Sequence, residues 1–182
     1  DNCPVCGIWP EYRDLRGTEE AQRNSAEYVS QLIDLASEIG SSIVAGPMYS
    51  CVGRCELYTD AEKEAQSDLI AGHLEKLCAK AEKAGVLLCL EALNRFETDC
   101  VNTLAQASAL IDKVGSPALK IHADTFHMNI EESDPAEAIR AAGDHIGHIH
   151  ASGSHRGIPG SGHVDWSGIF GALKDINYGG DI

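Results

Sequence analysis

One unit recurs along this chain, and it restricts the possible folds more than any other feature: an amphipathic helix, a glycine, then a short apolar run. Residues 60–84 show the helical spacing of apolar side chains, Gly85 follows, and Val86–Glu91 is typical of a strand. Glycine is favoured there because helices often end in a left-handed residue. The same pattern predicts helices over about 18–39 and 103–114, others opening at Asp134 and Asp165, and strands over Ser42–Gly46, Leu119–Asp124 and Ile146–His150.

Strands that alternate with helices need crossover connections, so the sheet is predicted to be parallel. The apolar runs indicate that both faces of the sheet are covered. A doubly wound sheet and a closed barrel both fit this repeat. No Gly-x-Gly-x-x-Gly follows any strand, which removes the main support for a dinucleotide-binding sheet. A complete (β/α)8 barrel needs about 250 residues. We therefore expect a single partial TIM-barrel domain over residues 1–182, without the first strands and the last strand.

Three of the predicted strands end on side chains that can bind a metal: Glu91, Asp124 and His150. A carboxylate at the end of a strand often caps the next helix, and any one of the three could have only that role. The carboxyl ends of barrel strands converge on one mouth, where barrel enzymes hold their chemistry. Two carboxylates and one imidazole suit Mn²⁺, Mg²⁺ or Co²⁺ better than a thiolate-rich zinc site does.

Long motifs in the chain resemble those of one enzyme family. Residues 90–97 read Leu-Glu-Ala-Leu-Asn-Arg-Phe-Glu, residues 124–132 read Asp-Thr-Phe-His-Met-Asn-Ile-Glu-Glu, and residues 147–150 read Gly-His-Ile-His. Together with the shorter stretches at 46–50 and 159–166, they resemble the D-tagatose 3-epimerase / D-psicose (allulose) 3-epimerase family. That family is a branch of the xylose-isomerase-like barrels. The likeness covers nearly the whole chain.

This resemblance implies a role for each matching residue. Glu91, Asp124 and His150 match three of the four metal ligands of the family, and Glu91 also matches one of its two acid/base carboxylates. The residues that match its substrate-binding side chains are Glu97, His127 and Arg156. The fourth ligand of the family is a glutamate on the last strand that doubles as the second acid/base, and we expect it beyond Ile182. The first two family strands are expected before Asp1.

The implied reaction is C3 epimerisation of a free ketohexose such as D-tagatose or D-psicose. A proton bound to carbon is removed and then returned from the opposite face, so one carboxylate is needed on each face of the sugar. A divalent cation, with Mn²⁺ the first expectation and Co²⁺ or Mg²⁺ the alternatives, stabilises the enediolate. Arg156 and His127 can donate hydrogen bonds to the developing oxyanion.

Some positions depart from the family pattern or fall outside it. Residues 152–155 read Ser-Gly-Ser-His where many relatives carry an acidic residue, so the particular sugar stays open. We expect His148 to be structural and to point to the opposite side of its strand from His150. We interpret His122 as sharing the face of Asp124, so that it could line the barrel.

Charge excludes several other functions. The chain has 28 acidic and 14 basic side chains, a formal net charge of −14, which disfavours nucleic acids and anionic membranes as partners. It therefore weighs against an AP endonuclease, which shares the barrel.

An aldose–ketose isomerase, or an epimerase of keto-inositols or 3-keto-glycosides, remains an alternative. A non-catalytic sugar-binding barrel is disfavoured, because binding alone has little need for a metal and a base.

Cysteine usage bears on the compartment. The seven cysteines show no disulfide-framework spacing, and the Cys3-x-x-Cys6 pair has no second pair to complete a zinc site. We expect reduced thiols in a cytoplasmic protein. A small sugar is the expected partner, together with further copies of the chain in a dimer or tetramer.

Overall fold

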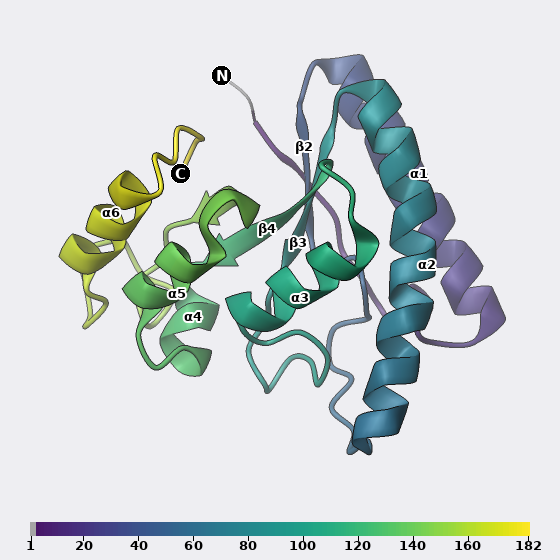
Figure 1. Ribbon diagram of the computed structural model, residues 1–182, viewed down its shortest axis with the longest axis horizontal. Helices are drawn as coiled ribbons and strands as arrows, with labels where there is room; N and C mark the ends of the chain where they lie inside the picture. Colours follow the sequence, from purple (N-terminus) through teal and green to yellow (C-terminus); the bar gives the residue numbers. More distant parts are fainter. Residues whose placement is uncertain (1–2) are drawn as a thin grey trace.

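The computed structural model describes residues 3–182, and its centre is one parallel sheet of five strands (Figure 1). The strands are β1 (Val5–Cys6), β2 (Ile43–Gly46), β3 (Leu87–Glu91), β4 (Leu119–Asp124) and β5 (Ile146–His150). They pair in the order β1-β2-β3-β4-β5, so each strand lies beside the next one in the sequence. A doubly wound sheet would reverse its order at a switch point, whereas a barrel adds its strands in sequence. The expected partial TIM barrel is therefore confirmed.

The helices form where the sequence predicts them. They are α1 (Glu19–Ile39), α2 (Asp60–Ala84), α3 (Leu104–Val114), α5 (Pro135–Ala142) and α6 (Trp166–Asp175). In Figure 1 α1 and α2 run side by side along one flank of the sheet, and α6 packs on α5 at the other end. Gly40, Gly85 and Gly115 end the first three helices with φ of 78°, 68° and 68°, the left-handed conformation expected from glycine.

Three short elements escaped the sequence analysis. The strand β1 has two residues, too few to show any periodicity. The helix α4 (Thr125–Glu131) starts directly after β4, with Asp124 as its N-cap, and has seven residues. It carries part of the motif at 124–132, so a stretch that we predicted only as a motif is in fact a helical turn beside the sheet. A short 3₁₀ turn, Gly143–His145, leads into β5.

The two faces of the sheet differ in what covers them. Leu88 and Leu90 of β3 belong to the large core between the sheet and the helices. Leu87 and Cys89 point the other way, into a small inner cluster with Ile43 and Ala45. Alternation along β3 therefore places Glu91 on this inner face, which is the barrel interior in a (β/α)8 fold.

The register of the strands determines which inner residues lie level with each other. Glu91 pairs with His122, and Asp124 pairs with His150. The register between β4 and β5 shifts after Ile121, so that Gly147 is an extra residue in a β-bulge. A Cβ on Gly147 would lie 2.5 Å from that of Lys120 and 2.9 Å from Cys89 Sγ, so only glycine fits.

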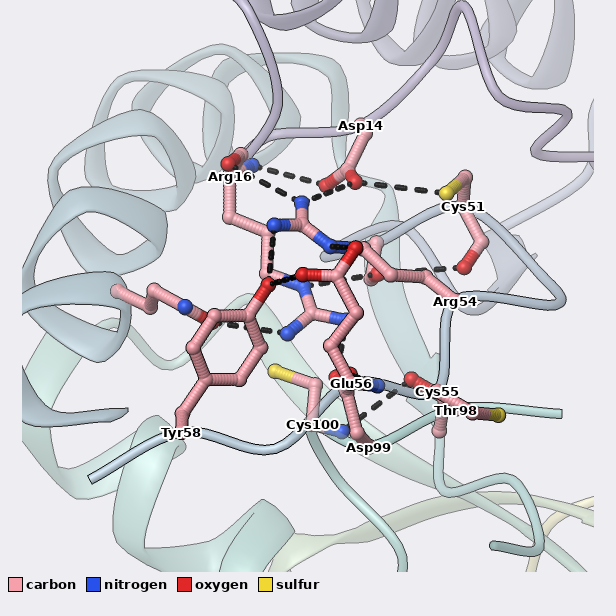
Figure 2. Close-up of polar contacts among 12 residues, drawn as sticks. Asp14, Arg16, Cys51, Arg54, Cys55, Glu56, Tyr58, Thr98, Asp99 and Cys100 are labelled. Carbon is pink, nitrogen blue, oxygen red and sulfur yellow. Dashed lines mark hydrogen bonds and ion pairs between the residues drawn. The ribbon is translucent and has the colours of Figure 1, made fainter. Parts of the chain in front are cut away.

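A buried ionic network holds the loops beside the mouth of the sheet (Figure 2). Arg16, whose side chain is 1% exposed, forms an ion pair with Asp99. Its Nε donates to Ser50 Oγ at 3.0 Å and its Nη1 to Gln66 Oε1 at 2.8 Å. Arg54 Nη1 pairs with Asp14 Oδ2 at 2.9 Å. The network joins four parts of the chain: the segment at 14–16, the loop at 50–54, Gln66 of α2 and Asp99.

We expect Arg16→Met to destabilise the fold by about 3–5 kcal/mol, because it leaves the Asp99 carboxylate, which is 12% exposed, without its cationic partner. The matched control is Arg23→Met, since Arg23 pairs with Glu19 on the surface of α1, where such pairs contribute about 0–1 kcal/mol. Urea unfolding followed by circular dichroism measures both. A loss for Arg16→Met no larger than that of the control would contradict a structural role for the network.

No helix within residues 3–182 is both long and apolar enough to cross a membrane.

Candidate active site

A cleft of about 430 Å³ opens at the carboxyl ends of the strands. Four polar side chains line it: Glu91, Glu97, His127 and Arg156. The rest of its wall consists of glycine and apolar residues from the N-terminal segment and the strand-to-helix loops, Gly7, Ile8, Trp9, Pro10, Pro47, Val52 and Leu93. All four polar residues were predicted as site residues from the sequence. The structure brings them to one cleft.

Glu91 ends β3, and its surroundings raise the pKa of its carboxylate. Its main-chain oxygen accepts a hydrogen bond from buried Tyr49 at 2.9 Å, which holds the end of the strand in place. Its carboxylate oxygens lie 3.6 Å from His127 Nε2 and 3.7 Å from His122 Nδ1. Burial, and then the charge of Asp124, raise the pKa of Glu91 to about 8. A carboxylate with such a pKa can exchange protons near neutral pH.

Asp124 has two functions at once. Its Oδ1 accepts a hydrogen bond from the Phe126 main-chain nitrogen at 2.8 Å, as an N-cap of α4. Its Oδ2 lies 3.8 Å from Arg156 Nη1. The capping role that we considered for strand-terminal carboxylates is therefore real for Asp124, and it leaves the second oxygen directed to the site.

The tautomer of His127 follows from its neighbours. The main-chain N–H of Asn94 donates to His127 Nδ1 at 3.0 Å, and the Asn94 side-chain nitrogen lies 2.9 Å from the same atom. Burial lowers the pKa of His127, so the ring is neutral and Nδ1 accepts. The remaining proton is then on Nε2, which faces Glu91. His127 is thus a hydrogen-bond donor toward the cleft.

Glu97 and Arg156 form the outer polar wall. Arg156 Nη2 lies 3.3 Å from Glu97 Oε1, which also accepts from Asn94 Nδ2 at 2.9 Å. The guanidinium carbon of Arg156 lies 4.0 Å from the centre of the Phe126 ring, a cation–π contact. The backbone of Arg156 has a φ of 61°, in the left-handed region. Asn94 and Phe126 were not singled out from the sequence, although both lie inside the motifs quoted there.

The potential metal ligands fall into two groups. Glu91 and Asp124 gather with His127, whereas His150 gathers with His122 and His148. Ligand atoms within each group lie within 4.8 Å of one another. The two groups meet at the end of β4, because Asp124 and His150 are register partners. The predicted ligands thus lie next to each other on the inner face, with Asp124 of β4 between Glu91 of β3 and His150 of β5.

One expectation about orientation was wrong. His148 does not point away from His150: the two rings are 4.9 Å apart, on the inner face of β5. Residues two apart on a strand point to the same side, and the expectation overlooked this alternation. His122 does line the inner face, with its ring centre 3.9 Å from that of His150.

Comparison with known proteins finds sugar epimerases among the relatives of this chain. A family model described as a xylose isomerase-like TIM barrel matches residues 2–181. The chain is 40% identical over 170 residues to the L-ribulose 3-epimerase of Mesorhizobium japonicum, covering 93% of this chain and 56% of that protein. It is 37% identical over 161 residues to the D-psicose 3-epimerase of Enterocloster bolteae, covering 88% and 53%. The chain thus spans about half the length of the curated relatives it matches.

Solved structures agree with these sequence matches. An L-ribulose 3-epimerase structure superposes with a TM-score of 0.90 at 38% identity, covering 96% of this chain and 58% of that one. A D-allulose 3-epimerase from Methylomonas sp., solved in complex with D-allulose, superposes with a TM-score of 0.89 at 32% identity, covering 96% and 60%.

Proposed function

The chain belongs to the xylose isomerase-like TIM barrel family, and on this premise we propose that the whole protein is a metal-dependent epimerase that inverts C3 of a free ketose. Its relatives named as L-ribulose and D-psicose 3-epimerases support the reaction class. One observation in the structure carries the proposal: Glu91 lies buried beside Asp124 and His127 in a sugar-sized cleft, with its pKa raised to about 8.

The donor set fits a divalent cation. The carboxylates of Glu91 and Asp124 lie together, and burial, followed by the charge of Asp124, raises the pKa of Glu91. We propose that Glu91, Asp124 and His150 hold the ion, with Mn²⁺ the first choice because oxygen ligands dominate. His127 is the less suitable ligand, since its Nδ1 accepts from Asn94 and its Nε2 carries the proton. When bound, the ion polarises the carbonyl and hydroxyl oxygens of the sugar and stabilises negative charge on them.

We assign the remaining steps of the reaction to other residues of the cleft and to Glu91 itself. Glu91, in its ionised form, removes the proton from C3. His127 donates from Nε2 to the sugar oxygen on which charge develops, and Arg156 adds a second donor. Glu97, held by Asn94 and Arg156, binds a sugar hydroxyl. Return of the proton from the opposite face needs a second acid/base, and we propose for it the glutamate of the last barrel strand of the family.

The direct test is an NMR screen of free ketoses with the whole protein and Mn²⁺ in deuterated water. L-ribulose, D-psicose and D-tagatose should each give the C3 epimer with deuterium at C3. Aldoses and 3-keto-glycosides are included in the same screen, because they represent the isomerase and 4-epimerase alternatives. Conversion of only those compounds would reject the proposal.

We expect His127→Ala to raise KM for the ketose more than it lowers kcat, because it removes a contact to substrate and leaves the base in place. Steady-state kinetics on the best ketose separates the two constants. The control is His73→Ala, since His73 lies on α2 and contacts Gln22. A fall in kcat equal to that of a Glu91 variant, at unchanged KM, would instead make His127 part of the proton transfer.

Two further properties complete the proposal. A cytoplasmic location is supported by seven cysteines that are all free thiols. Assembly as a dimer or tetramer follows from the family resemblance, and light scattering of the purified protein tests it.

A further inference from the structure

Three imidazoles meet on the inner face of the sheet, below the cleft. His122 comes from β4, and His148 and His150 come from β5. Their ring centres are 5.2 Å (His122–His148), 3.9 Å (His122–His150) and 4.9 Å (His148–His150) apart. One nitrogen from each ring lies within 4.8 Å of the other two. We refer to these three residues as the histidine cluster.

Two of the three rings are fully enclosed and have no hydrogen bonds. His122 is 1% exposed and His148 is 3% exposed. Within residues 3–182, neither nitrogen of either ring has a hydrogen-bond partner. The carboxylate of Glu91 is 3.7 Å from His122 Nδ1, too far for a hydrogen bond. Buried polar atoms are nearly always paired, so four nitrogens beside each other without a partner among residues 3–182 are available to bind a ligand.

The β-bulge explains how the cluster forms. It pairs His122 directly with His148, although a regular register running from Ile121–Ile146 would pair His122 with Gly147. The bulge therefore aligns the two buried rings, and His150 follows on the same face.

From these observations we propose that the histidine cluster is a second transition-metal site, which shares His150 with the first and takes Zn²⁺ in preference to Mn²⁺ or Mg²⁺. Three imidazoles with one open position are a known zinc ligand set, with Zn–N distances of about 2.0–2.1 Å. Ligands of a tetrahedral ion at that distance are about 3.4 Å apart, so small ring rotations close the site. Neutral nitrogen donors without a carboxylate do not suit Mg²⁺ or Mn²⁺.

His150 connects this site to the proposed function. It belongs both to the histidine cluster and to the ligand set Glu91–Asp124–His150. An ion in the cluster withdraws His150 from the carboxylates, so zinc should act as an inhibitor of the Mn²⁺ enzyme. This inhibition rests on the proposed epimerase activity, whereas zinc binding itself does not.

The test measures Zn²⁺ affinity of the purified protein by competition with a coloured chelator. His148→Phe keeps the ring size and removes the donor, and we expect it to weaken zinc binding by about 100-fold or more, since even loss of groups that only support a ligand costs 10–100-fold. His148→Cys supplies a thiolate, another zinc ligand, and should keep most of the affinity. His145→Phe is the matched control, because His145 contacts Asp112 outside the cluster. Thermal melts without metal establish that each variant folds.

Co²⁺ absorption gives a second readout that does not depend on activity. Co²⁺ in the cluster should show the intense visible bands of tetrahedral geometry, which His148→Phe removes and Glu91→Gln retains. Equal zinc affinity in wild type and His148→Phe, or loss of the Co²⁺ bands only in Glu91→Gln, would overturn the proposal. If no ketose is epimerised but zinc binding depends on His148, the proposed function fails and the histidine site stands.

Discussion

Glu91→Gln is expected to abolish epimerisation by the whole protein while weakening metal binding only in part. Loss of a general base costs about 10²–10⁴-fold in rate, and loss of a charge beside the metal places this variant at the upper end. Glutamine keeps the size of the side chain and one oxygen ligand. In the native protein the Glu91 carboxylate lies 3.6 Å from His127 Nε2, and the Oε1 of glutamine can still face that ring. The change therefore separates the role of Glu91 as a base from its role as a ligand.

The decisive measurement is exchange of the C3 hydrogen of the ketose with deuterated water, followed by NMR beside epimer formation. Exchange and epimerisation should fall together in Glu91→Gln. The control Glu137→Gln changes an exposed carboxylate of α5 that pairs with Arg140, and it should exchange at the wild-type rate. Should Glu91→Gln still exchange near that rate, Glu91 is only a ligand and another residue removes the proton.

Removal of divalent metal is expected to have the other large effect, lowering epimerisation to background. Add-back of Mn²⁺, Co²⁺ or Mg²⁺ should restore activity, whereas Zn²⁺ alone should not, because oxygen-rich ligand sets favour the harder ions. Dialysis against a chelator followed by single-metal titration tests this. Activity that survives chelation, or that returns only with zinc, would contradict the metal assignment.

The raised pKa of Glu91 adds a pH dependence to metal binding. The metal binds the ionised carboxylate, and the ionised fraction increases as the pH rises through the pKa of about 8, where half of the carboxyl groups are ionised. The Mn²⁺ dissociation constant should therefore fall as pH rises from 6 to 8, with release of a proton. Glu91→Gln should remove this part of the pH dependence. The variant should bind Mn²⁺ more weakly than the wild type at every pH, through its remaining ligands. Calorimetry in buffers of different ionisation enthalpy counts the released protons.

The helices, the longer strands and the residue types at the strand ends could be predicted from the sequence. The helices α1, α2 and α3 follow from apolar spacing and from glycines at 40, 85 and 115, which are local signals. The motifs at 90–97 and 124–132 predict Glu91, Glu97 and His127 as site residues from the sequence alone. Local information sufficed because propensity, alternation and helix ends depend on neighbours in the chain.

The conformations of single side chains at the site could not be predicted from the sequence. The proton position on His127 depends on Asn94, which is 33 residues away in the sequence. Arg156, on the loop after β5, stacks on Phe126, which is in the first turn of α4 and distant in the sequence. Neither contact leaves a periodic trace in the sequence.

Only the tertiary structure determined how the ligands are grouped. Strand alternation specifies the face of each side chain, but register is set by hydrogen bonds between strands that are distant in sequence. That register places Glu91 level with His122 and Asp124 level with His150, and the bulge at Gly147 brings His148 beside His122. The sequence by itself determined that Glu91, Asp124 and His150 end three parallel strands. The stagger between those strands, a property of their pairing, decided that three imidazoles gather separately from the two carboxylates.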